Sequence, residues 1–341
     1  MKTSLIVNEV SENSSIGYSP QQIKKAYNIS NYGNGNGVSV AVIDFIGNRY
    51  LQNNLNIFSR EFGLPETELK FYGDINNGDN FNFSAYIEPS VDTQWIHGIS
   101  PYSEIRIIRA TNFTVPGVID AVKTAIELNT DIILQTFQAP FEEEYLKYSD
   151  IYNNNTVFIA SAGDYGAGAF FPSCFPQCIS VGGTSLDIDN NGNRNGVESA
   201  WTESGGGICR YIDIPDYQLK FSPINTLTMG KRGVPDVSFL AYPDTGYAVY
   251  HSSIEDSFGW YSAGGTSIAA AVIAGIIANL ISYTALSDKS NMIRYLYNMA
   301  GETSYTNPYN VFNDITTGGN GEFSARPGYD LCTGLGSLIN I

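Results

Sequence analysis

The chain has 341 residues, enough for one large domain or two modest ones, and 43% of them are hydrophobic. Acidic residues outnumber basic ones 34 to 18, for a net charge of -16, which argues against nucleic acids and anionic membranes as partners because both are bound through clustered Lys and Arg. Aromatic residues make up 13%, which argues against a disordered chain.

Apolar, β-branched runs alternate with helical patterns through the first half of the chain. Strands are predicted at residues 38–44, 104–109, 131–137, 156–160 and 178–181. Helices are predicted at residues 21–27, 87–99, 116–128 and 141–153. Apolar strands that alternate with helices are typical of a parallel sheet covered on both faces. The pattern therefore predicts an α/β fold with a mostly parallel central sheet flanked by helices.

The second half is less regular and ends in a Gly- and Asn-rich tail. Residues 234–253 alternate as strands do, and residues 267–285 form a long apolar helix. The apolar run at 268–281 is interrupted by Gly275 and Asn279 and is too short to span a membrane, so we expect a buried central helix. No linker or internal repeat divides the chain, which predicts a single domain.

The cysteines leave several states open. Cys174 and Cys178 lie in SCFPQC between two prolines, which fits a local disulfide and also a pair of free thiols. The remaining cysteines and the two histidines, Cys209, Cys332, His97 and His251, have no metal-ligand spacing, which argues against zinc.

A nucleophile candidate lies in residues 262–271 (SAGGTSIAAA), where a glycine turn runs into an apolar helix. Ser267 at this helix start has free backbone N–H groups beside it and the positive end of the helix dipole behind it, an arrangement that stabilises a developing oxyanion. The alternative is an ordinary serine cap before a buried helix.

A base candidate lies in residues 87–95 (IEPSVDTQW). Glu88 and Asp92 are four residues apart, so a helix places both on one face, where two close carboxylates share a proton. Glu88 could then take the proton of Ser267, with Asp92 hydrogen-bonded behind it. The alternative is a solvated acidic helix face.

Several ordered motifs, beginning near Gly17, resemble the sedolisin family, the serine-carboxyl peptidases. They are GYSPQQIKKAYNI, FSREFGLP, SAGDYG, SVGGTSL, ESAWTESGGG, RGVPDVSFLAYPDTGY, GGTSIAAAVIAG and GYDLCTGLGS. The resemblance implies a subtilisin-like three-layer fold. It also implies that Ser267 is the nucleophile, that Glu88 and Asp92 are the catalytic carboxylates, and that Asp164 in SAGDYG supports the oxyanion.

An aspartate at the oxyanion has a consequence for pH. Asp164 can donate a hydrogen bond only when protonated, and its ionised form would repel the oxyanion. A glutamate base also operates in acid, because its ordinary pKa is low. The motifs therefore predict an enzyme that is active at acidic pH.

A rival assignment uses Asp44, His97 and Ser267, which occur in the chain order of the subtilisins. His97 lies nine residues after Glu88, about 900° around a helix and hence on its opposite side. WIHGISP also lacks the HGTH pattern of subtilisins, so we expect His97 to pack the helix. Asp44 is then expected behind the acidic pair.

Sedolisins bind substrate as an added strand between two backbone segments, which correspond here to Thr136, Phe137 and Gln138 and to Ser204, Gly205 and Gly206. The family often has tryptophan where this chain has Phe137. Phenylalanine has no indole N–H, so a proton network beyond Asp92 is shortened and the pocket is shaped differently.

Two segments resemble calcium loops. Residues 187–198 (DIDNNGNRNGVE) fit the EF-hand pattern, but a strand precedes them and DNNG is a hairpin signal, so we expect a β-turn. The sedolisin calcium site is the better match in the tail. It corresponds to the side chains of Asp314 and Asp330 and to the carbonyls of Ile315, Arg326 and Gly328.

These observations predict an acid-active serine-carboxyl endopeptidase with one structural Ca²⁺, acting on peptides or proteins as a monomer. The alternatives are a catalytically silent binding or surface protein and a subtilisin-type peptidase. We expect one domain over residues 1–341, with 1–16 as an N-terminal extension, 303–341 as the calcium-binding loop region and no pro-domain. Secretion is implied by the family alone, since residues 1–15 show no signal peptide.

Overall fold

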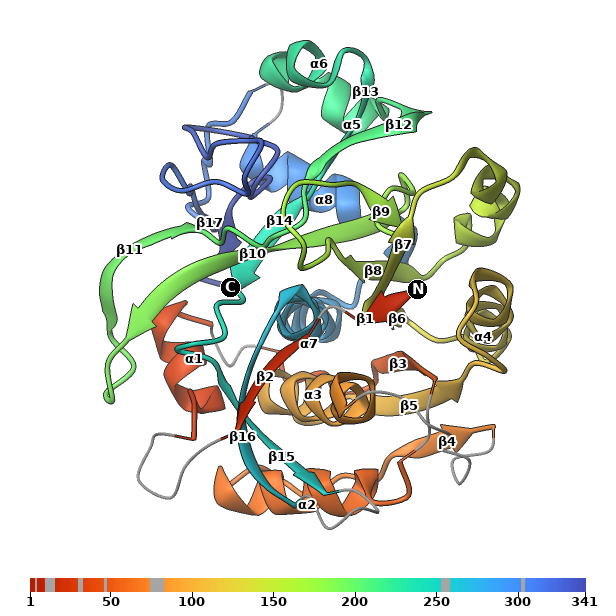
Figure 1. Cartoon of the computed structure of the whole chain (residues 1–341), viewed down its shortest axis with the longest axis vertical. Helices are drawn as coiled ribbons and strands as arrows, with labels where there is room; N and C mark the ends of the chain where they lie inside the picture. The colour runs from red at the N-terminus through yellow and green to blue at the C-terminus, as the bar shows by residue number, and fades with distance from the viewer. Residues whose placement is uncertain are drawn as a thin grey trace.

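The computed structural model describes residues 1–3, 5–9, 16–29, 33–45, 48–73, 83–252, 258–301 and 304–341. Its centre is a ten-stranded sheet with the order β17-β18-β14-β10-β8-β6-β3-β5-β4, and β11 pairs with β10 at one side (Figure 1). The strands are β3 (Ser39–Asp44), β4 (Lys70–Tyr72), β5 (Glu104–Arg109), β6 (Ile132–Gln135), β8 (Val157–Ser161), β10 (Cys178–Ile188), β11 (Arg194–Ala200), β14 (Val237–Leu240), β17 (Phe312–Asn313) and β18 (Ser337–Leu338).

The sheet is mostly parallel, as predicted. All pairings from β18 to β4 are parallel, and only β17 with β18 and β10 with β11 run antiparallel. The carboxyl ends of β3, β6 and β8 therefore meet at one edge. In sheets of this kind that edge is where ligands bind.

Helices cover both faces of the sheet, because alternate strand residues are apolar on both sides. Val40 and Val42 of β3 join the core under α3 and α7, while Ala41 and Ile43 join the core under α4. The helices are α1 (Pro20–Ala26), α2 (Leu51–Glu61), α3 (Phe83–Ile99), α4 (Val115–Glu127), α5 (Asp216–Leu219), α6 (Ser222–Thr228), α7 (Thr266–Thr284) and α8 (Met292–Ala300), with 3-10 helices η1 (Glu143–Tyr152) and η2 (Lys289–Asn291).

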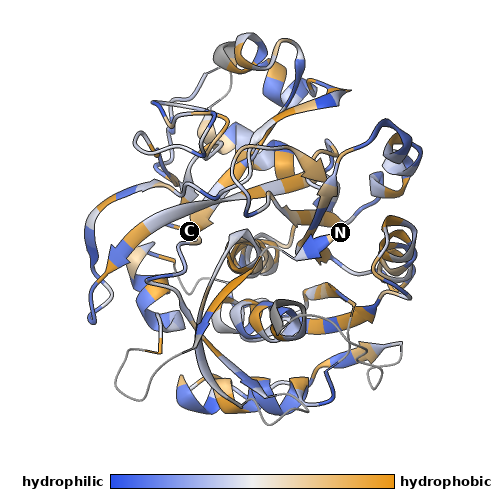
Figure 2. Cartoon of the chain, in the orientation of Figure 1, coloured by the Kyte–Doolittle hydropathy of each residue, from blue (hydrophilic) through white to orange (hydrophobic). Residues whose placement is uncertain are grey.

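The predicted central helix is α7. By length and composition alone it could cross a membrane, but 83% of its most apolar window is buried inside the protein. Figure 2 shows it coloured largely as hydrophobic, next to the central strands. Its apolar character is that of a core helix.

The predicted helix at residues 141–153 is wrong in type, because the structure has the 3-10 helix η1 there. Tyr152 is its only buried residue, so no continuous apolar face stabilises a regular α-helix. The predicted strand at 131–137 also divides into two, β6 and β7 (Phe137–Pro140).

Three small sheets complete the fold, and N-terminal residues supply a strand to two of them. They join β1 (Lys2–Thr3), β7 and β9 (Phe170–Phe171); β15 (Tyr247–Ser252), β16 (Phe258–Gly264) and β2 (Ile6–Glu9); and β12 (Gly207–Asp213) and β13 (Lys231–Val234). Residues 2–3 and 6–9, within the segment expected as an extension, thus each supply a strand to the body.

The disulfide links Cys174 to Cys209, with Cα atoms 5.6 Å apart, so the local pairing of Cys174 with Cys178 is wrong. Cys178 and Cys332 are buried free thiols. The bond closes a loop of 35 residues in sequence, a pairing that spacing alone could not single out.

Candidate active site

The first turn of α7 presents Ser267 at the edge of the sheet. Gly265 is the residue before the helix and has φ 119°, a backbone conformation that only glycine adopts readily. The glycine turn therefore lets β16 pass directly into α7. Ser267 lies within the first turn, where backbone N–H groups have no acceptor inside the helix, and its side chain is fully buried.

Glu88 and Asp92 project from neighbouring turns of α3. Glu88 is 6% exposed and Asp92 is fully buried. The Oγ1 of Thr136, just past the end of β6, donates a hydrogen bond of 2.8 Å to Oδ2 of Asp92. The side chain of Thr136, a residue expected to bind substrate through its backbone, is thus bonded to the acidic pair.

The electrostatics of the pair favour the protonated forms. Burial raises the pKa of Glu88 well above its usual range, and the charges of Asp92 and Asp164 raise it further. The hydroxyls of Ser267 and Thr136 lie near enough to lower the pKa of Glu88 in part. Burial also raises the pKa of Asp92, and the charge of Asp44 at the end of β3 adds to it. The pair therefore holds at least one proton in acid.

Asp164 follows β8 and faces the start of α7. Its Oδ1 accepts hydrogen bonds from the backbone N–H of Thr266 at 2.8 Å and from Oγ1 of Thr266 at 2.7 Å. Burial raises the pKa of Asp164 to about 7, so the group is protonated in acid. Because Oδ1 already accepts two hydrogen bonds, the proton of the carboxylic acid belongs on Oδ2.

Five buried oxygen atoms at this place make no hydrogen bond within the described part of the chain. They are both carboxylate oxygens of Glu88, Oδ1 of Asp92, Oδ2 of Asp164 and Oγ of Ser267. Buried polar atoms are normally paired, so a cluster of unpaired ones indicates a site that a polar ligand completes. The structure thus brings together the four residues that the motifs singled out.

His97 is held on another side of α3. It is buried, its Nε2 lies 3.0 Å from the carbonyl oxygen of Pro65, and burial lowers the pKa of His97 to about 4. This contact matches the packing role expected for it.

Sequence reasoning missed the contacts that anchor α3 to β15. Gln94 exchanges two hydrogen bonds with the backbone of Tyr250, at 2.7 and 2.9 Å. The indole of Trp95 donates to Ala248 O at 3.1 Å, and Ser90 Oγ lies 3.1 Å from Nδ1 of His251. Buried polar residues on an otherwise apolar helix were the available signal.

The second predicted substrate segment is bonded within the protein. The N–H groups of Ser204, Gly205 and Gly206 donate to the carbonyls of Trp201, Gly163 and Gly168 at 3.1, 2.7 and 2.9 Å. The Ser204 hydroxyl accepts from Gly183 N at 2.8 Å. These residues brace the loop that carries Asp164.

The residues beside Thr136 are also enclosed. Phe137 is fully buried, with its ring centroid 5.1 Å from that of Phe45, and Gln138 is 3% exposed. The backbone of this segment is paired as well, because Lys2 and Thr3 of β1 lie opposite Gln138 and Phe137.

Two aspartates in the tail are brought together by loop hydrogen bonds. Oδ2 of Asp314 accepts from Gly328 N and Oδ2 of Asp330 accepts from Arg326 N, each at 2.9 Å. The carbonyls of Ile315, Arg326 and Gly328 accept no backbone hydrogen bond among the described loop residues. No group of three or more His, Cys, Asp or Glu side chains suited to a metal occurs in the described ranges, so any cation here would depend on carbonyl oxygens.

The EF-hand-like residues 187–198 form the hairpin between β10 and β11, as expected. Oδ1 of Asp189 accepts from the N–H groups of Asn191 and Asn193 at 2.9 and 2.8 Å. Glu198 is buried and bonded to Tyr27, among others, at 2.8 Å. Both carboxylates are therefore occupied within the protein.

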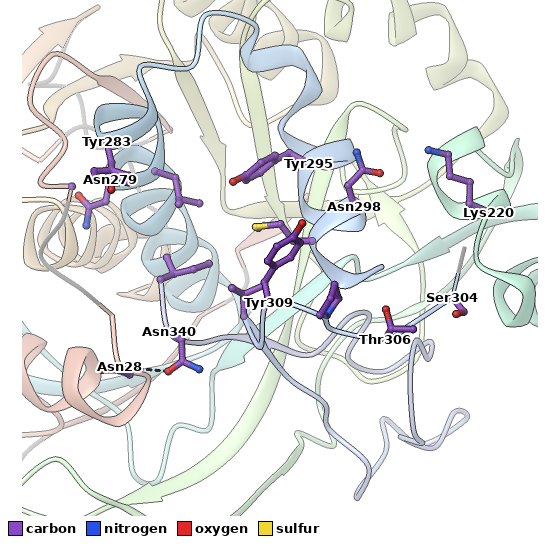
Figure 3. A pocket seen from close by; sticks show the side chains of 16 residues that line it. Asn28, Lys220, Asn279, Tyr283, Tyr295, Asn298, Ser304, Thr306, Tyr309 and Asn340 are labelled. Carbon is purple, nitrogen blue, oxygen red and sulfur yellow. Dashed lines mark hydrogen bonds between the residues drawn. The ribbon is translucent and has the colours of Figure 1, made fainter. Parts of the chain in front are cut away.

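A separate cavity of about 1720 Å³ lies at the far end of α7 (Figure 3). Its sixteen lining residues include four asparagines and three tyrosines, and Asn28 and Asn340 are hydrogen-bonded at 2.7 Å on one side. Asn279 in its wall is twelve residues after Ser267, about 18 Å along the helix. The cavity is thus distinct from the acidic cluster.

Comparison with curated proteins finds similar sequences. Kumamolisin from Bacillus sp. (strain MN-32) is 27% identical over 371 aligned residues, covering 95% of this chain and 62% of kumamolisin. Sedolisin from Pseudomonas sp. (strain 101) is 30% identical over 186 residues, covering 49% of this chain and 28% of sedolisin. The chain thus spans less than two thirds of the length of these relatives. No family model matches the chain.

Comparison with solved structures also finds similar proteins. Pseudomonas sedolisin (serine-carboxyl proteinase), complexed with two molecules of pseudo-iodotyrostatin, has a TM-score of 0.81 at 22% identity over 96% of each chain. Sphericase has a TM-score of 0.58 at 14% identity, over 96% of this chain and 99% of that one. These likenesses show a shared α/β fold of the subtilisin-like type.

Proposed function

We propose that this chain, a relative of the sedolisin family with a subtilisin-like fold, is a serine-carboxyl endopeptidase that works in acid. The observation that carries the proposal is the buried cluster of unpaired oxygens on Ser267, Glu88, Asp92 and Asp164. The relatedness to kumamolisin and sedolisin supports the same reaction class.

In the proposed reaction, Ser267 Oγ attacks the carbonyl carbon of the scissile peptide while Glu88 takes the hydroxyl proton. The oxyanion is held by the protonated Oδ2 of Asp164 and by the backbone N–H of Ser267. Glu88 returns the proton to the leaving amine, which leaves an acyl-enzyme. Water then attacks the ester with Glu88 again as base, and Ser267 is regenerated.

The raised pKa values define the working protonation state. Glu88 must be ionised to act as base, so the single proton of the acidic pair belongs on Asp92. The Oδ1 of Asp92 is unpaired and can carry it, since Oδ2 accepts from Thr136. Asp164 must be protonated, a state held below about pH 7. Activity should therefore rise as the pair loses its first proton and fall as Asp164 ionises.

The test is peptide hydrolysis against pH for the wild type, Ser267→Ala, Glu88→Gln and His97→Ala. We expect an acidic optimum that the first two variants abolish and the third retains. A neutral or alkaline optimum lost in His97→Ala would favour a subtilisin-type peptidase. Failure of a peptide aldehyde to label the wild type in acid would favour a catalytically silent protein.

We further propose one structural Ca²⁺ held by Asp314 and Asp330 and by the carbonyls of Ile315, Arg326 and Gly328. Burial raises the pKa of both aspartates, and burial together with the charges of these two aspartates raises the pKa of the nearby Tyr305. A cation would offset this concentration of negative charge, and carboxylate and carbonyl oxygens are the donors calcium prefers.

We also place the protein outside the cell as a monomer that acts on peptides or proteins. The disulfide between Cys174 and Cys209 supports an oxidising compartment. Size-exclusion chromatography and thiol counting on protein isolated from its source would test both statements.

A further inference from the structure

The cavity at the far end of α7 is walled by α7, by α8 and by the loop that follows α8. Asn279 and Tyr283 are four residues apart on α7, and Tyr295 and Asn298 are three apart on α8. Each helix therefore turns one tyrosine and one asparagine toward the cavity. Figure 3 shows Tyr295 and Tyr309 in the middle of the view, with the two α7 residues at one side.

The three tyrosines of the cavity are exposed. Tyr283, Tyr295 and Tyr309 have 63, 40 and 69% of their surface accessible. Single exposed apolar residues are ordinary on a protein surface, whereas several around one hollow mark a binding site. A tyrosine ring offers a ligand a rigid apolar face and a polar tip.

A buried amide in the wall lacks a hydrogen-bond partner. Asn279 is 6% exposed, and its Nδ2 donates to the carbonyl oxygen of Ile99 at 3.1 Å. Its Oδ1 has no partner within the described part of the chain. Buried polar atoms are normally paired, so this oxygen indicates a ligand that supplies a donor. Ser304 and Thr306 add hydroxyls to the lining, and a hydroxyl both donates and accepts.

The cavity is nearly uncharged in a strongly acidic protein. Among the described residues that line it, Lys220 has the only charged side chain, although the chain has 34 acidic residues. The lining therefore favours a neutral ligand. Its volume of about 1720 Å³ exceeds the roughly 300–1,000 Å³ of pockets for small molecules, which indicates a ligand of several units.

The cavity does not suit an extended polypeptide held by strand pairing. None of the described lining residues belongs to a β-strand, because the walls are helices and loops. Extended peptides are commonly bound through a free strand edge, and no such edge lines this cavity in the described ranges. The polar groups that remain are side-chain amides and hydroxyls, which match a ligand rich in hydroxyl groups.

The loop that carries Tyr309 is held in place by one asparagine. Oδ1 of Asn307 accepts from Val311 N at 3.1 Å, and its Nδ2 donates to Phe312 O at 2.7 Å. The backbone N–H of Asn307 donates to the carbonyl of Ala300, the last residue of α8, at 2.7 Å. A wall that is ordered before binding reduces the entropy lost when a ligand enters.

We propose that this cavity binds a neutral oligosaccharide. The sugar rings lie with their C–H faces on Tyr295 and Tyr309, and their hydroxyls bond to the surrounding amides and hydroxyls. Oδ1 of Asn279 accepts from one of these hydroxyls. The site is about 18 Å along α7 from Ser267, so the ligand does not touch the reacting atoms. Binding is therefore independent of the proposed function.

The test is isothermal titration calorimetry on the full chain. The probes are neutral hexasaccharides of α-linked glucose, β-linked glucose, mannose and N-acetylglucosamine. Tyr295→Ala and Tyr309→Ala each remove one ring, whereas Tyr309→Phe keeps the ring and removes only the hydroxyl. Tyr102→Ala is the matched control, because Tyr102 is 56% exposed and lies outside the cavity lining. The melting temperature of each variant verifies the fold.

We expect at least one hexasaccharide to bind, and each alanine variant in the cavity to weaken binding by about tenfold or more. Tyr309→Phe and Tyr102→Ala should bind as the parent does. Absence of binding by all four saccharides, or unchanged binding in both alanine variants, would overturn the proposal. Saccharide binding by a chain without hydrolytic activity would defeat the proposed function and leave this inference standing.

Two further arms identify the source of the ligand and exclude other occupants. A glycopeptide that carries the same saccharide and binds more tightly than the free saccharide would place the ligand on a protein, and equal affinity would indicate a free or polymeric saccharide. Labelled casein is tested against the Ser267→Ala chain. Casein binding that Tyr309→Ala abolishes, without any saccharide binding, would assign the cavity to polypeptides and refute the proposal. A dimer on size-exclusion chromatography that the same variant dissociates, again without saccharide binding, would assign it to a second copy.

Discussion

Replacing Asp164 with asparagine separates the hydrogen-bond donor from its titration. Oδ2 of Asp164 is buried and unpaired, while Oδ1 accepts two hydrogen bonds from Thr266. Asparagine can keep both contacts and present an N–H where the carboxylic acid presents an O–H. Unlike the acid, the amide has no proton to lose. The alkaline limb of the pH profile should therefore move upward.

The magnitude follows from the pKa of about 7 for Asp164. Above that pH the protonated fraction falls tenfold per unit, so at pH 9 the wild type should retain about 1% of its acid kcat/KM. Asp164→Asn should stay within about tenfold of the wild type in acid and exceed it at pH 9. Asp164→Ala, which has no donor, should lose about 10²–10³ at every pH.

The assay is kcat/KM for a chromogenic peptide from pH 3 to pH 9, with circular dichroism at each pH to verify folding. Asp120→Asn on the exposed surface of α4 is the matched control, because its side chain is 62% exposed. An alkaline limb that stays in place in Asp164→Asn would refute the assignment of Asp164 as the titrating donor.

Four other outcomes are expected. Thr136→Val removes a hydroxyl that lowers the pKa of both Glu88 and Asp92, so the pair should lose its first proton at a higher pH. The acid limb of kcat/KM should then move upward, with activity lower by about tenfold, and an unchanged acid limb would count against this role. Burial raises the folded-state pKa of Asp164 from 3.8 to about 7. Its contribution to the free energy of unfolding, roughly 4 kcal/mol, is therefore fully present below about pH 4 and is lost as pH rises through about 7. Urea unfolding at pH 4 and pH 8 should show that Asp164→Asn becomes more stable relative to the wild type only at the higher pH. Arg232→Met leaves the fully buried Asp236 without its ion-pair partner at 2.7 Å and should lower the free energy of unfolding by about 3–5 kcal/mol in the same assay. Lys231→Met, at the exposed pair with Asp213, should lower it by less than about 1 kcal/mol. A calcium chelator should lower the melting temperature of the wild type by an amount equivalent to about 2–3 kcal/mol of unfolding free energy. If the chelator leaves the melting temperature of Asp330→Asn unchanged, the bound ion belongs to the loop that carries Asp330. Equal sensitivity of both proteins would place the ion elsewhere.

Several parts of the candidate site follow from rules that act over a few residues. Glu88 and Asp92 share a helix face because the helical repeat brings residues four apart together. Ser267 lies in the first turn of a helix because the glycines before it permit the turn that β16 makes into α7. Such local rules, together with the alternation of strands and helices, were enough to predict the α/β fold and to offer Ser267, Glu88 and Asp92 as candidates, whereas Asp164 was predicted from the resemblance to the sedolisin family.

Other parts depend on which distant segments meet. Thr136 bonds to Asp92 across 44 positions of sequence, and the Cys174–Cys209 disulfide crosses 35. Arg232 and Asp236 are only four residues apart in sequence, yet nothing in the surrounding sequence shows that both charged side chains are buried away from water. Phe137 is enclosed because it packs with Phe45, which lies just past the end of β3.

The sequence by itself determined most of the secondary-structure pattern, the choice of candidate side chains and the acidic character of the candidate site. Only the tertiary structure decided which oxygens stay unpaired, which carboxyl holds its proton to about pH 7, and that residues 6–9 lie on the edge of β16. The reason is that desolvation and strand-edge pairing depend on neighbours that chain folding brings together, and neither leaves a periodic pattern in the sequence.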